Sequence, residues 1–144
     1  NSVIFGYSNK GHDGYLGDSV LGEWCNLGAG TTNSNLKNNA SEVRIWTPGG
    51  ELNAGIKCGV MMGDYTRTCI NTAINTGTVI GVSANVYGAG LTPKYIPSFS
   101  WGSDGVQRYD LEKALLDIAD WKKLKNQVLT EDEKSILKAV YEKF

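Results

Sequence analysis

Residues 62–90 decide the fold, and they read MGDYTR TCINTA INTGTV IGVSAN VYGAG when written in groups of six. The first positions of the groups, all apolar except the second, are Met62, Thr68, Ile74, Ile80 and Val86. The fifth positions, all small, are Thr66, Thr72, Thr78, Ala84 and Gly90. A period of six fits neither an amphipathic helix nor one long strand, whereas it fits short strands that each end at a tight corner. The repeat therefore predicts a parallel β-helix, in which three groups close one triangular coil and coils stack about 4.8 Å apart.

A second run with the same period precedes this one, over residues 15–31. Its first positions are Tyr15, Leu21 and Leu27, and its fifth positions are Ser19, Cys25 and Thr31. The period then fails in a polar, turn-rich stretch and resumes near Ile56, with Val60 in a fifth position. Leu27 and Ile56 are 29 residues apart, which is not a multiple of six. We therefore expect a protruding loop within about residues 33–55.

The composition limits the possible classes of protein. A chain of 144 residues with net charge −1 predicts one domain and gives no reason to expect a nucleic-acid or membrane partner. No apolar run reaches the roughly 18 residues of a membrane span. The three cysteines, Cys25, Cys58 and Cys69, are an odd number, so we expect reduced thiols in a cytoplasmic protein. Because the chain opens at Asn1 inside an expected strand, we expect it to be part of a longer protein.

The last third of the chain differs in character from the repeats. We expect the β-helix body to occupy residues 1–91, followed over residues 92–144 by an irregular segment and two helices. Asp110 is suited to cap the first helix, with Leu111, Leu115 and Ile118 on one face. Thr130 and Glu133 form a capping box for the second helix. The apolar face expected behind that box consists of Ile136, Leu137, Val140, Tyr141 and Phe144.

His12, the only histidine, lies in the polar loop NKGHDGY. A loop histidine is often an inert surface residue, and its functional alternative is a general base. No metal site is expected, because one histidine and three cysteines without paired spacing do not make a usual zinc site.

The run GHDGYLGDSVLGEWCNLGAGTTNSNLK, residues 11–37, resembles the acetyltransferase domain of the bifunctional sugar-1-phosphate nucleotidylyltransferase / glucosamine-1-phosphate N-acetyltransferase family. The block KCGVMMGDYTRTCIN, residues 57–71, resembles the continuation of that domain. The resemblance covers residues 1 to about 91. It implies a left-handed β-helix, assembly as a homotrimer, and transfer of acetyl from acetyl-CoA to an amino-sugar 1-phosphate. It also implies a nucleotidylyltransferase domain before Asn1, which alone would use Mg²⁺.

The resemblance assigns roles residue by residue. His12 matches the general base, while Tyr15, Asn26 and Asn35 match residues that hold the sugar phosphate. Cofactor contacts are expected from four residues of the repeats: Gly28, Ala29, Asp64 and Gly88. The family's lysine in the inserted loop is replaced here by Ser41. Lys37 and Arg44 are nearby cations that can substitute for it, or they are ordinary solvated charges.

Two alternative functions remain open on the sequence. One is a non-catalytic β-helix that trimerises or regulates a sugar nucleotidylyltransferase, which Ser41 favours. The other is a hexapeptide acyltransferase for a different acceptor, such as a sugar nucleotide or serine. An enzyme requires His12 and a scaffold does not, so this residue separates the two classes.

Overall fold

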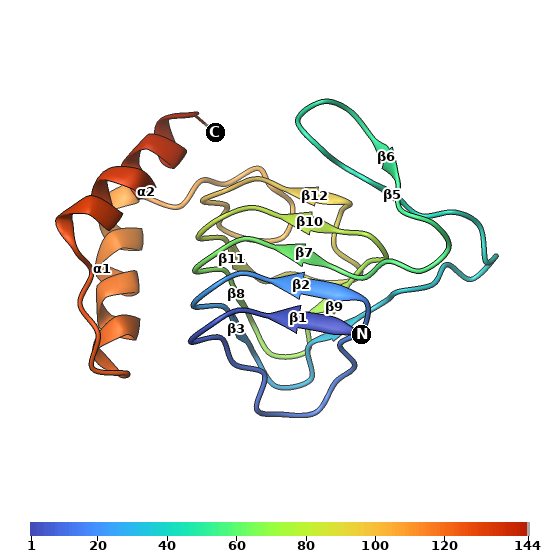
Figure 1. Ribbon diagram of the computed structural model, residues 1–144, viewed down its shortest axis with the longest axis horizontal. Helices are drawn as coiled ribbons and strands as arrows, with labels where there is room; N and C mark the ends of the chain where they lie inside the picture. Colours follow the sequence, from blue (N-terminus) through green and yellow to red (C-terminus); the bar gives the residue numbers. More distant parts are fainter. Residues whose placement is uncertain (144) are drawn as a thin grey trace.

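The computed structural model describes residues 1–143, which form a parallel β-helix with two helices along one edge (Figure 1). The first sheet, which faces the viewer in Figure 1, contains in order β1 (Ser2–Ile4), β2 (Ser19–Leu21), β7 (Met61–Met62), β10 (Val79–Ile80) and β12 (Tyr95–Ile96). The second sheet contains β11 (Asn85–Val86), β8 (Arg67–Thr68) and β3 (Asn26–Leu27). The third sheet pairs β4 (Thr32–Asn33) with β9 (Ala73–Ile74). All pairs in these three sheets are parallel, which confirms the predicted architecture.

The register shows why the sequence repeats every six residues. Met62 pairs with Ile80, 18 positions later, so three groups of six make one coil. The predicted inward positions from Met62 to Val86 are buried, as are the fifth positions except Gly90. Tyr15 and Ile56 were expected to point inward and do not: they are 53% and 56% exposed. The backbone carbonyl of Tyr15 accepts from the N–H of Asn33, and the Tyr15 ring turns outward to the side chain of Asn35. Ile56 still belongs to the inserted segment that follows β6.

The β-helix continues beyond residue 91, where an irregular segment was expected. β12 pairs with β10, and Ile96 is buried in the same core as Ile80. Trp101 forms a further parallel bridge with Asn85. Ile96 follows Ile80 by 16 positions instead of 18, so this last coil is shorter and does not keep the period of six.

The inserted segment leaves the body between the third and first sheets. The N–H of Cys58 donates to the carbonyl of Asn35 at 2.9 Å and closes the excursion. Within it, β5 (Arg44–Ile45) and β6 (Leu52–Asn53) form an antiparallel hairpin that projects from the body (Figure 1). The expected loop is therefore present, but it starts later than residue 33 because Asn33 still fills an inward position of β4.

One corner of the coil carries a column of mostly aromatic residues, which we call the aromatic corner. It lies between the first and second sheets, three residues after each inward residue of the first sheet. Its members, each with φ between 53° and 62°, are Tyr7, Trp24, Tyr65, Ser83 and Phe99. Such a φ costs a residue with a side chain about 1–2 kcal/mol. The cost is offset by packing, since Tyr7 and Trp24 stack at 4.2 Å and Phe99 is fully buried.

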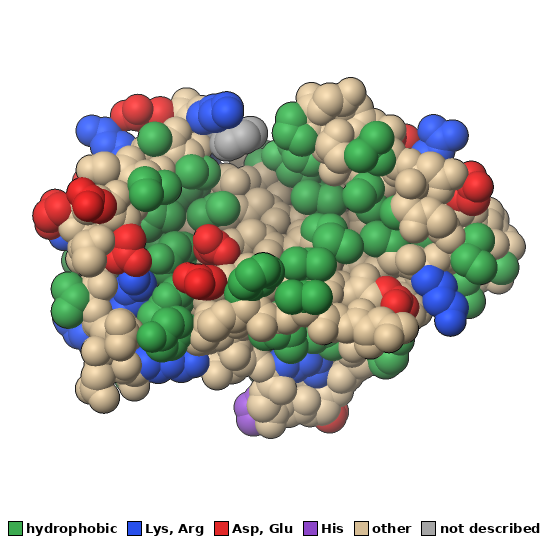
Figure 2. All heavy atoms as spheres, in the orientation of Figure 1, with side chains coloured by type: hydrophobic (Ala, Val, Ile, Leu, Met, Phe, Trp, Pro, Cys, Tyr) green, Lys and Arg blue, Asp and Glu red, His purple; other side chains and the backbone are tan. Residues whose placement is uncertain are grey.

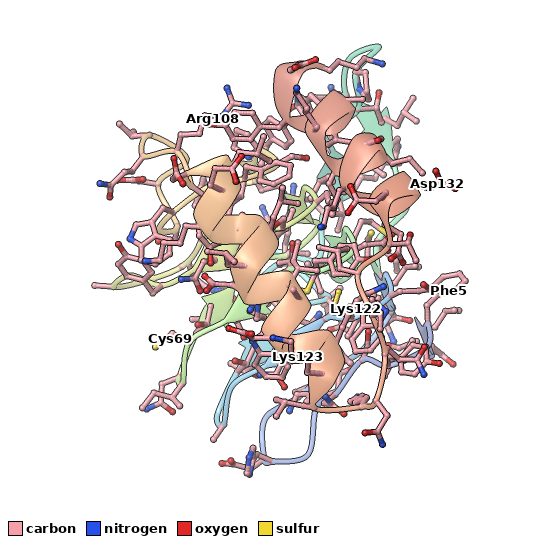
Figure 3. The ribbon with its side chains drawn as sticks, turned by 90° about the vertical axis from the view of Figure 1, so that its left-hand side faces the viewer. Phe5, Cys69, Arg108, Lys122, Lys123 and Asp132 are labelled. Carbon is pink, nitrogen blue, oxygen red and sulfur yellow. The ribbon has the colours of Figure 1, made fainter. Side chains whose placement is uncertain are left out.

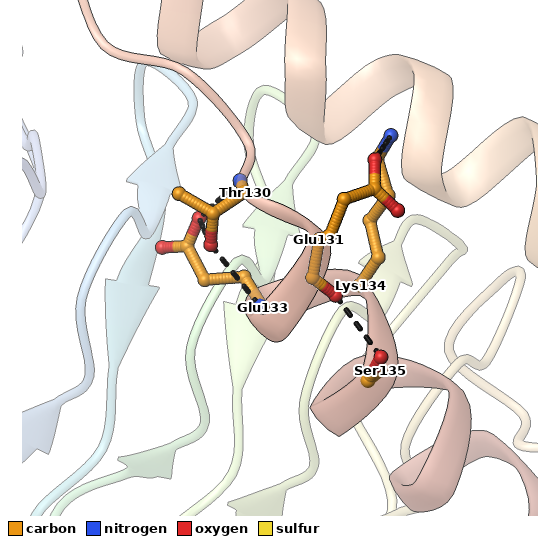
Figure 4. A network of polar contacts seen from close by, with 5 residues as sticks. All are labelled: Thr130, Glu131, Glu133, Lys134 and Ser135. Atoms are coloured by element: carbon orange, nitrogen blue, oxygen red, sulfur yellow. Dashed lines mark hydrogen bonds and ion pairs between the residues drawn. The ribbon is translucent and has the colours of Figure 1, made fainter.

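The two helices begin where the sequence predicted. Asp110 caps α1 (Leu111–Lys123) by accepting a hydrogen bond from the N–H of Lys113 at 2.9 Å. Thr130 and Glu133 form the predicted capping box of α2 (Glu131–Lys143), shown in Figure 4. Ile118 and Leu137 are buried as expected, whereas Ile136 is 64% exposed, so its assignment to the apolar face was wrong. Phe144 lies outside the described residues.

The helices lie on the aromatic corner of their own chain. Lys122 of α1 is only 4% exposed and forms an ion pair with Glu133 of α2. Its ammonium group lies 5.3 Å from the ring centre of Trp24 and 5.8 Å from that of Tyr65. Figure 3 shows Lys122 directed from α1 toward the body. The tail is thus held to the β-helix by a buried charge as well as by apolar packing.

We predict that Glu133→Gln destabilises the protein in a pH-dependent way. Burial opposes the charged form of Glu133, but hydrogen bonds from Lys122 and Thr130 outweigh it and lower the pKa of this carboxyl. Because the folded-state pKa is depressed, the contribution to the free energy of unfolding is complete above the unfolded value of about 4.5 and is lost as the pH falls through the folded-state pKa. Urea unfolding should show a loss of about 2 kcal/mol at pH 7, the size of a hydrogen bond between charged groups at a partly exposed site, and a smaller loss at pH 3. Glu142→Gln, at an exposed position of the same helix, is the control; equal losses in both variants would contradict this account.

Candidate functional site

His12 lies in a loop whose shape is set by Lys10. The ammonium group of Lys10 donates to the carbonyls of His12, Asp13 and Gly14 at 3.3, 2.9 and 2.7 Å. The imidazole of His12 is exposed, and within residues 1–143 it has no hydrogen-bond partner. Lys10 therefore holds the backbone of the loop, while the imidazole of His12 remains open to solvent. The sequence analysis did not identify Lys10, because a lysine that binds its own loop has no distinctive motif.

This loop rests against the small-residue turn that follows β3. The N–H of Gly30 donates to the carbonyl of Asp13 at 3.3 Å. Gly14 has φ of 110°, and a Cβ there would lie 2.0 Å from the carbonyl oxygen of Thr31, so only glycine allows this approach. His12 is thus adjacent in sequence to a residue that contacts the Gly28–Thr31 turn.

The same turn stacks under equivalent turns of the next coils, and together they make the corner between the second and third sheets. The register makes Ala29, Ile70 and Gly88 successive members of this edge. The N–H of Asn71 donates to the carbonyl of Ala29 at 2.8 Å, and a Cβ on Gly28 would lie 2.7 Å from the backbone of Cys69. Gly28, Ala29 and Gly88 therefore share one edge, on which the exposed side chain of Ile70 lies between Ala29 and Gly88.

Tyr15 and Asn35 are brought together, with Asp18 as a third member. The side-chain amide of Asn35 donates to the Tyr15 hydroxyl at 2.9 Å and to the Asp18 carboxylate at 2.6 Å. Gly17 lies beneath the Tyr15 ring, where a Cβ would stand 2.1 Å from the hydroxyl oxygen. Asn33 holds Gly17 from the other side by hydrogen bonds to its N–H and carbonyl. These contacts give a structural reason for the Tyr-Leu-Gly-Asp sequence, and Asp18 is a member that the sequence analysis did not single out.

Two further candidates lie apart from this group. Asp64 sits at the aromatic corner, where its carboxylate accepts from the N–H of Glu23 at 2.8 Å and faces α2. It ties two coils together on a different edge, so Asp64 does not join Gly28 and Ala29 within one chain. Asn26 belongs to β3 and bridges to Asn9, whose side chain accepts from Lys125 at 3.1 Å.

Lys37 and Arg44 face a separate groove between the inserted hairpin and the body. The cavity has a volume of about 460 Å³ and is lined by Lys37, Arg44, Glu51, Asn75, Thr76 and Lys94. Neither His12 nor Tyr15 lines it. Ser41, at the position of the family's lysine, is exposed, and its N–H donates to the side chain of Asn39 at 3.1 Å. The two loop cations therefore do not join the His12 loop within one chain, and Lys94 joins them instead.

Other chemistry finds little support in the described part of the chain. Within residues 1–143, no three His, Cys, Asp or Glu side chains are grouped as metal ligands. Neither described helix is long and apolar enough to cross a membrane. The cysteines are free thiols, and burial raises the pKa of Cys25 to about 11, so it stays a neutral packing residue.

Comparison with known proteins shows relatives over more than half of the chain. The chain is 40% identical over 87 residues to a bifunctional sugar-1-phosphate nucleotidylyltransferase/acetyltransferase of Sulfurisphaera tokodaii, covering 60% of this chain and 22% of that protein. It is 32% identical over 80 residues to the bifunctional protein GlmU of Methanocaldococcus jannaschii, covering 56% and 20% of the two chains. The GlmU of Wigglesworthia glossinidia brevipalpis is 34% identical over 86 residues, covering 59% and 16%.

These matches show that more than half of the chain is homologous to a part of such bifunctional proteins. The chain spans about a fifth of the length of the curated relatives it matches. No family model matches it.

We predict that Gly17→Ala moves the Tyr15 ring and separates it from Asn35. The added Cβ would overlap the phenol, and the tyrosine side chain can rotate away, so the loss of stability should stay near the ~1 kcal/mol of one hydrogen bond. The measurement is the NMR signal of the Asn35 side-chain amide, together with urea unfolding. Gly11→Ala is the control, because no atom lies within 4 Å of a Cβ at that position. An unchanged Asn35 signal in Gly17→Ala would refute the arrangement.

Proposed function

We propose that this chain is the acetyltransferase part of a sugar-1-phosphate nucleotidylyltransferase, and that it transfers acetyl from acetyl-CoA to an amino-sugar 1-phosphate. The observation that carries the proposal is the hydrogen bond between Gly30 and Asp13, which joins the His12 loop to the small-residue edge. The proposed base and the proposed binding edge for the thioester are therefore neighbours. Homology to bifunctional nucleotidylyltransferase/acetyltransferases supports the same reaction class.

The reaction requires few groups from the protein. The amine of the sugar attacks the thioester carbonyl, a C–N bond forms, and the C–S bond breaks. His12 takes the proton from the amine and returns it to the departing thiolate, so no protein nucleophile is needed. The remaining requirement is to hold the two substrates in contact. The exposed, unpartnered imidazole of His12 suits this task.

Two groups of residues position the substrates in this proposal. The edge that carries Gly28, Ala29 and Gly88 accepts the pantetheine arm of acetyl-CoA, with the exposed Ile70 offering it an apolar contact. Tyr15 and Asn35 supply a hydroxyl and an amide to the acceptor sugar. Their mutual hydrogen bond at 2.9 Å fixes both side chains before the sugar arrives.

We also propose that the chain assembles as a homotrimer through the outer face of the first sheet. One residue from each strand forms an apolar ladder in register across this face: Val3, Val20, Met61, Val79 and Tyr95. Figure 2 shows hydrophobic side chains gathered over the same face. A continuous apolar ladder on a β-helix is stabilised when further copies cover it. Copies of this chain are the proposed occupants, because each copy presents the same ladder, whose Tyr95 end is covered by Trp46 of its own hairpin.

A non-catalytic scaffold is the second candidate, and Ser41 favours it. The loop cations Lys37 and Arg44 do not replace the missing lysine beside His12 within one chain. A scaffold would use the same apolar face for assembly and would need no base.

Replacing the proposed base separates the two functions. We expect His12→Ala to reduce acetyl transfer by about 10²–10⁴-fold, which is the usual loss for a general base. The melting temperature should barely move, because the imidazole has no partner in the described structure. The assay is thiol release from acetyl-CoA by the longer protein that carries this chain, with glucosamine-1-phosphate and galactosamine-1-phosphate as acceptors. Activity within threefold of wild type would show that His12 is not the base, and inactivity of the wild type would favour the scaffold.

A charge on the apolar ladder tests the assembly. Met61 points outward from the central strand of the first sheet, between Val20 and Val79, so Met61→Glu should convert a trimer into monomers without unfolding the chain. Sedimentation at micromolar concentration measures the mass. Leu116→Glu, at an exposed position of α1, is the control and should remain trimeric. A monomeric wild type, or a trimeric Met61→Glu, would contradict this interface.

A further inference from the structure

The groove between the inserted hairpin and the body gathers positive charge from distant parts of the sequence. Lys37 comes from the start of the inserted segment, Arg44 from β5, and Lys94 from the residue before β12. Glu51 is the one carboxylate in the lining, and it lies 3.8 Å from Arg44. Besides the Arg44–Glu51 pair, the groove therefore contains two lysines, Lys37 and Lys94.

Neither lysine has a carboxylate partner among residues 1–143. The ammonium group of Lys37 donates to the carbonyl of Glu42 at 2.7 Å, and that of Lys94 donates to the carbonyl of Thr76. Each ammonium group has three N–H donors, so both retain donors after these bonds. The carbonyls orient the two side chains and leave their charge uncompensated.

The two lysine charges lower the stability of the folded protein when no anion is bound in the groove. Burial, followed by the nearby charge of Lys37, lowers the pKa of Lys94, while Cys58 and Glu51 act in the opposite direction. Two like charges held together in a partly buried groove cost stability, and a bound anion would remove that cost. Asn75 and Thr76 line the same space.

We propose that this groove is a binding site for a phosphate monoester, held by Lys37 and Lys94. Lysine binds phosphate as a point charge and needs no bidentate geometry, so two lysines from different segments suffice. The volume of about 460 Å³ exceeds that of the phosphate alone and leaves room for part of the group that carries it. The site lies away from the His12 loop, and binding there requires no acetyl transfer.

The first experiment measures binding of inorganic phosphate by calorimetry and by ³¹P NMR. We expect Lys94→Gln and Lys37→Gln each to weaken binding by about tenfold, the loss of one charge-assisted contact. Lys138→Gln on the exposed side of α2 removes the same charge elsewhere and should bind as the wild type does. If Lys94→Gln does not fold, Lys37→Gln carries the test alone. No binding by the wild type, or equal binding by all variants, would overturn the proposal.

Further arms identify the source of the phosphate. Glucosamine-1-phosphate is compared with glucosamine, and CoA with dephospho-CoA, which lacks the 3′-phosphate. A phosphate-dependent gain that is lost in Lys94→Gln supports the site and names its ligand. If neither compound shows such a gain, the groove takes no phosphate monoester. Binding of inorganic phosphate at Lys37 and Lys94 requires no acetyl transfer, so failure of the proposed reaction and failure of this site give different results.

Discussion

The backbone hydrogen bonds between successive coils constrain every other feature of this protein. The N–H of Met61 donates to the carbonyl of Thr78 at 2.9 Å, and that of Gly63 donates to Ile80 at 2.8 Å. A shift of one residue in the register would turn each inward side chain outward. The strands of each coil must therefore keep the register of the strands in the neighbouring coils. Extra residues then have no place in the body and must leave it at a corner. The inserted hairpin and the groove beneath it follow from this requirement.

The sequence predicted the β-helix body well, because the period of six residues follows directly from the alignment of inward side chains between coils. The prediction failed where that period is interrupted. Asn33 is inward and polar, since its amide is satisfied by Gly17, and an apolar pattern cannot identify such a residue. The last coil was missed because Ile96 follows Ile80 after 16 residues, two fewer than a regular coil. In both places a contact with the neighbouring coil determines the structure, and the local sequence pattern does not show it.

The candidate site shows the same division. The motif alone identified His12, Tyr15 and Asn35, and the structure joins the last two directly. Lys10 and Lys94 were not identified, because their roles depend on which carbonyls the fold brings to their ammonium groups. Lys94 in particular meets the inserted segment only because the chain has completed two more coils after leaving it. The spacing of residues in the sequence does not indicate that Lys94 lies beside the inserted segment.

The helical tail changes how the β-helix should come apart. In a solenoid each coil contacts only its neighbours, so the ends can fray one coil at a time. Here Lys125 donates to the carbonyl of Tyr7 in the first coil, while Tyr141 packs edge-on against Phe99 in the last. The helical tail therefore contacts both the first and the last coil of the β-helix. Opening either end strains the tail, and local fraying becomes coupled to cooperative unfolding of the whole chain.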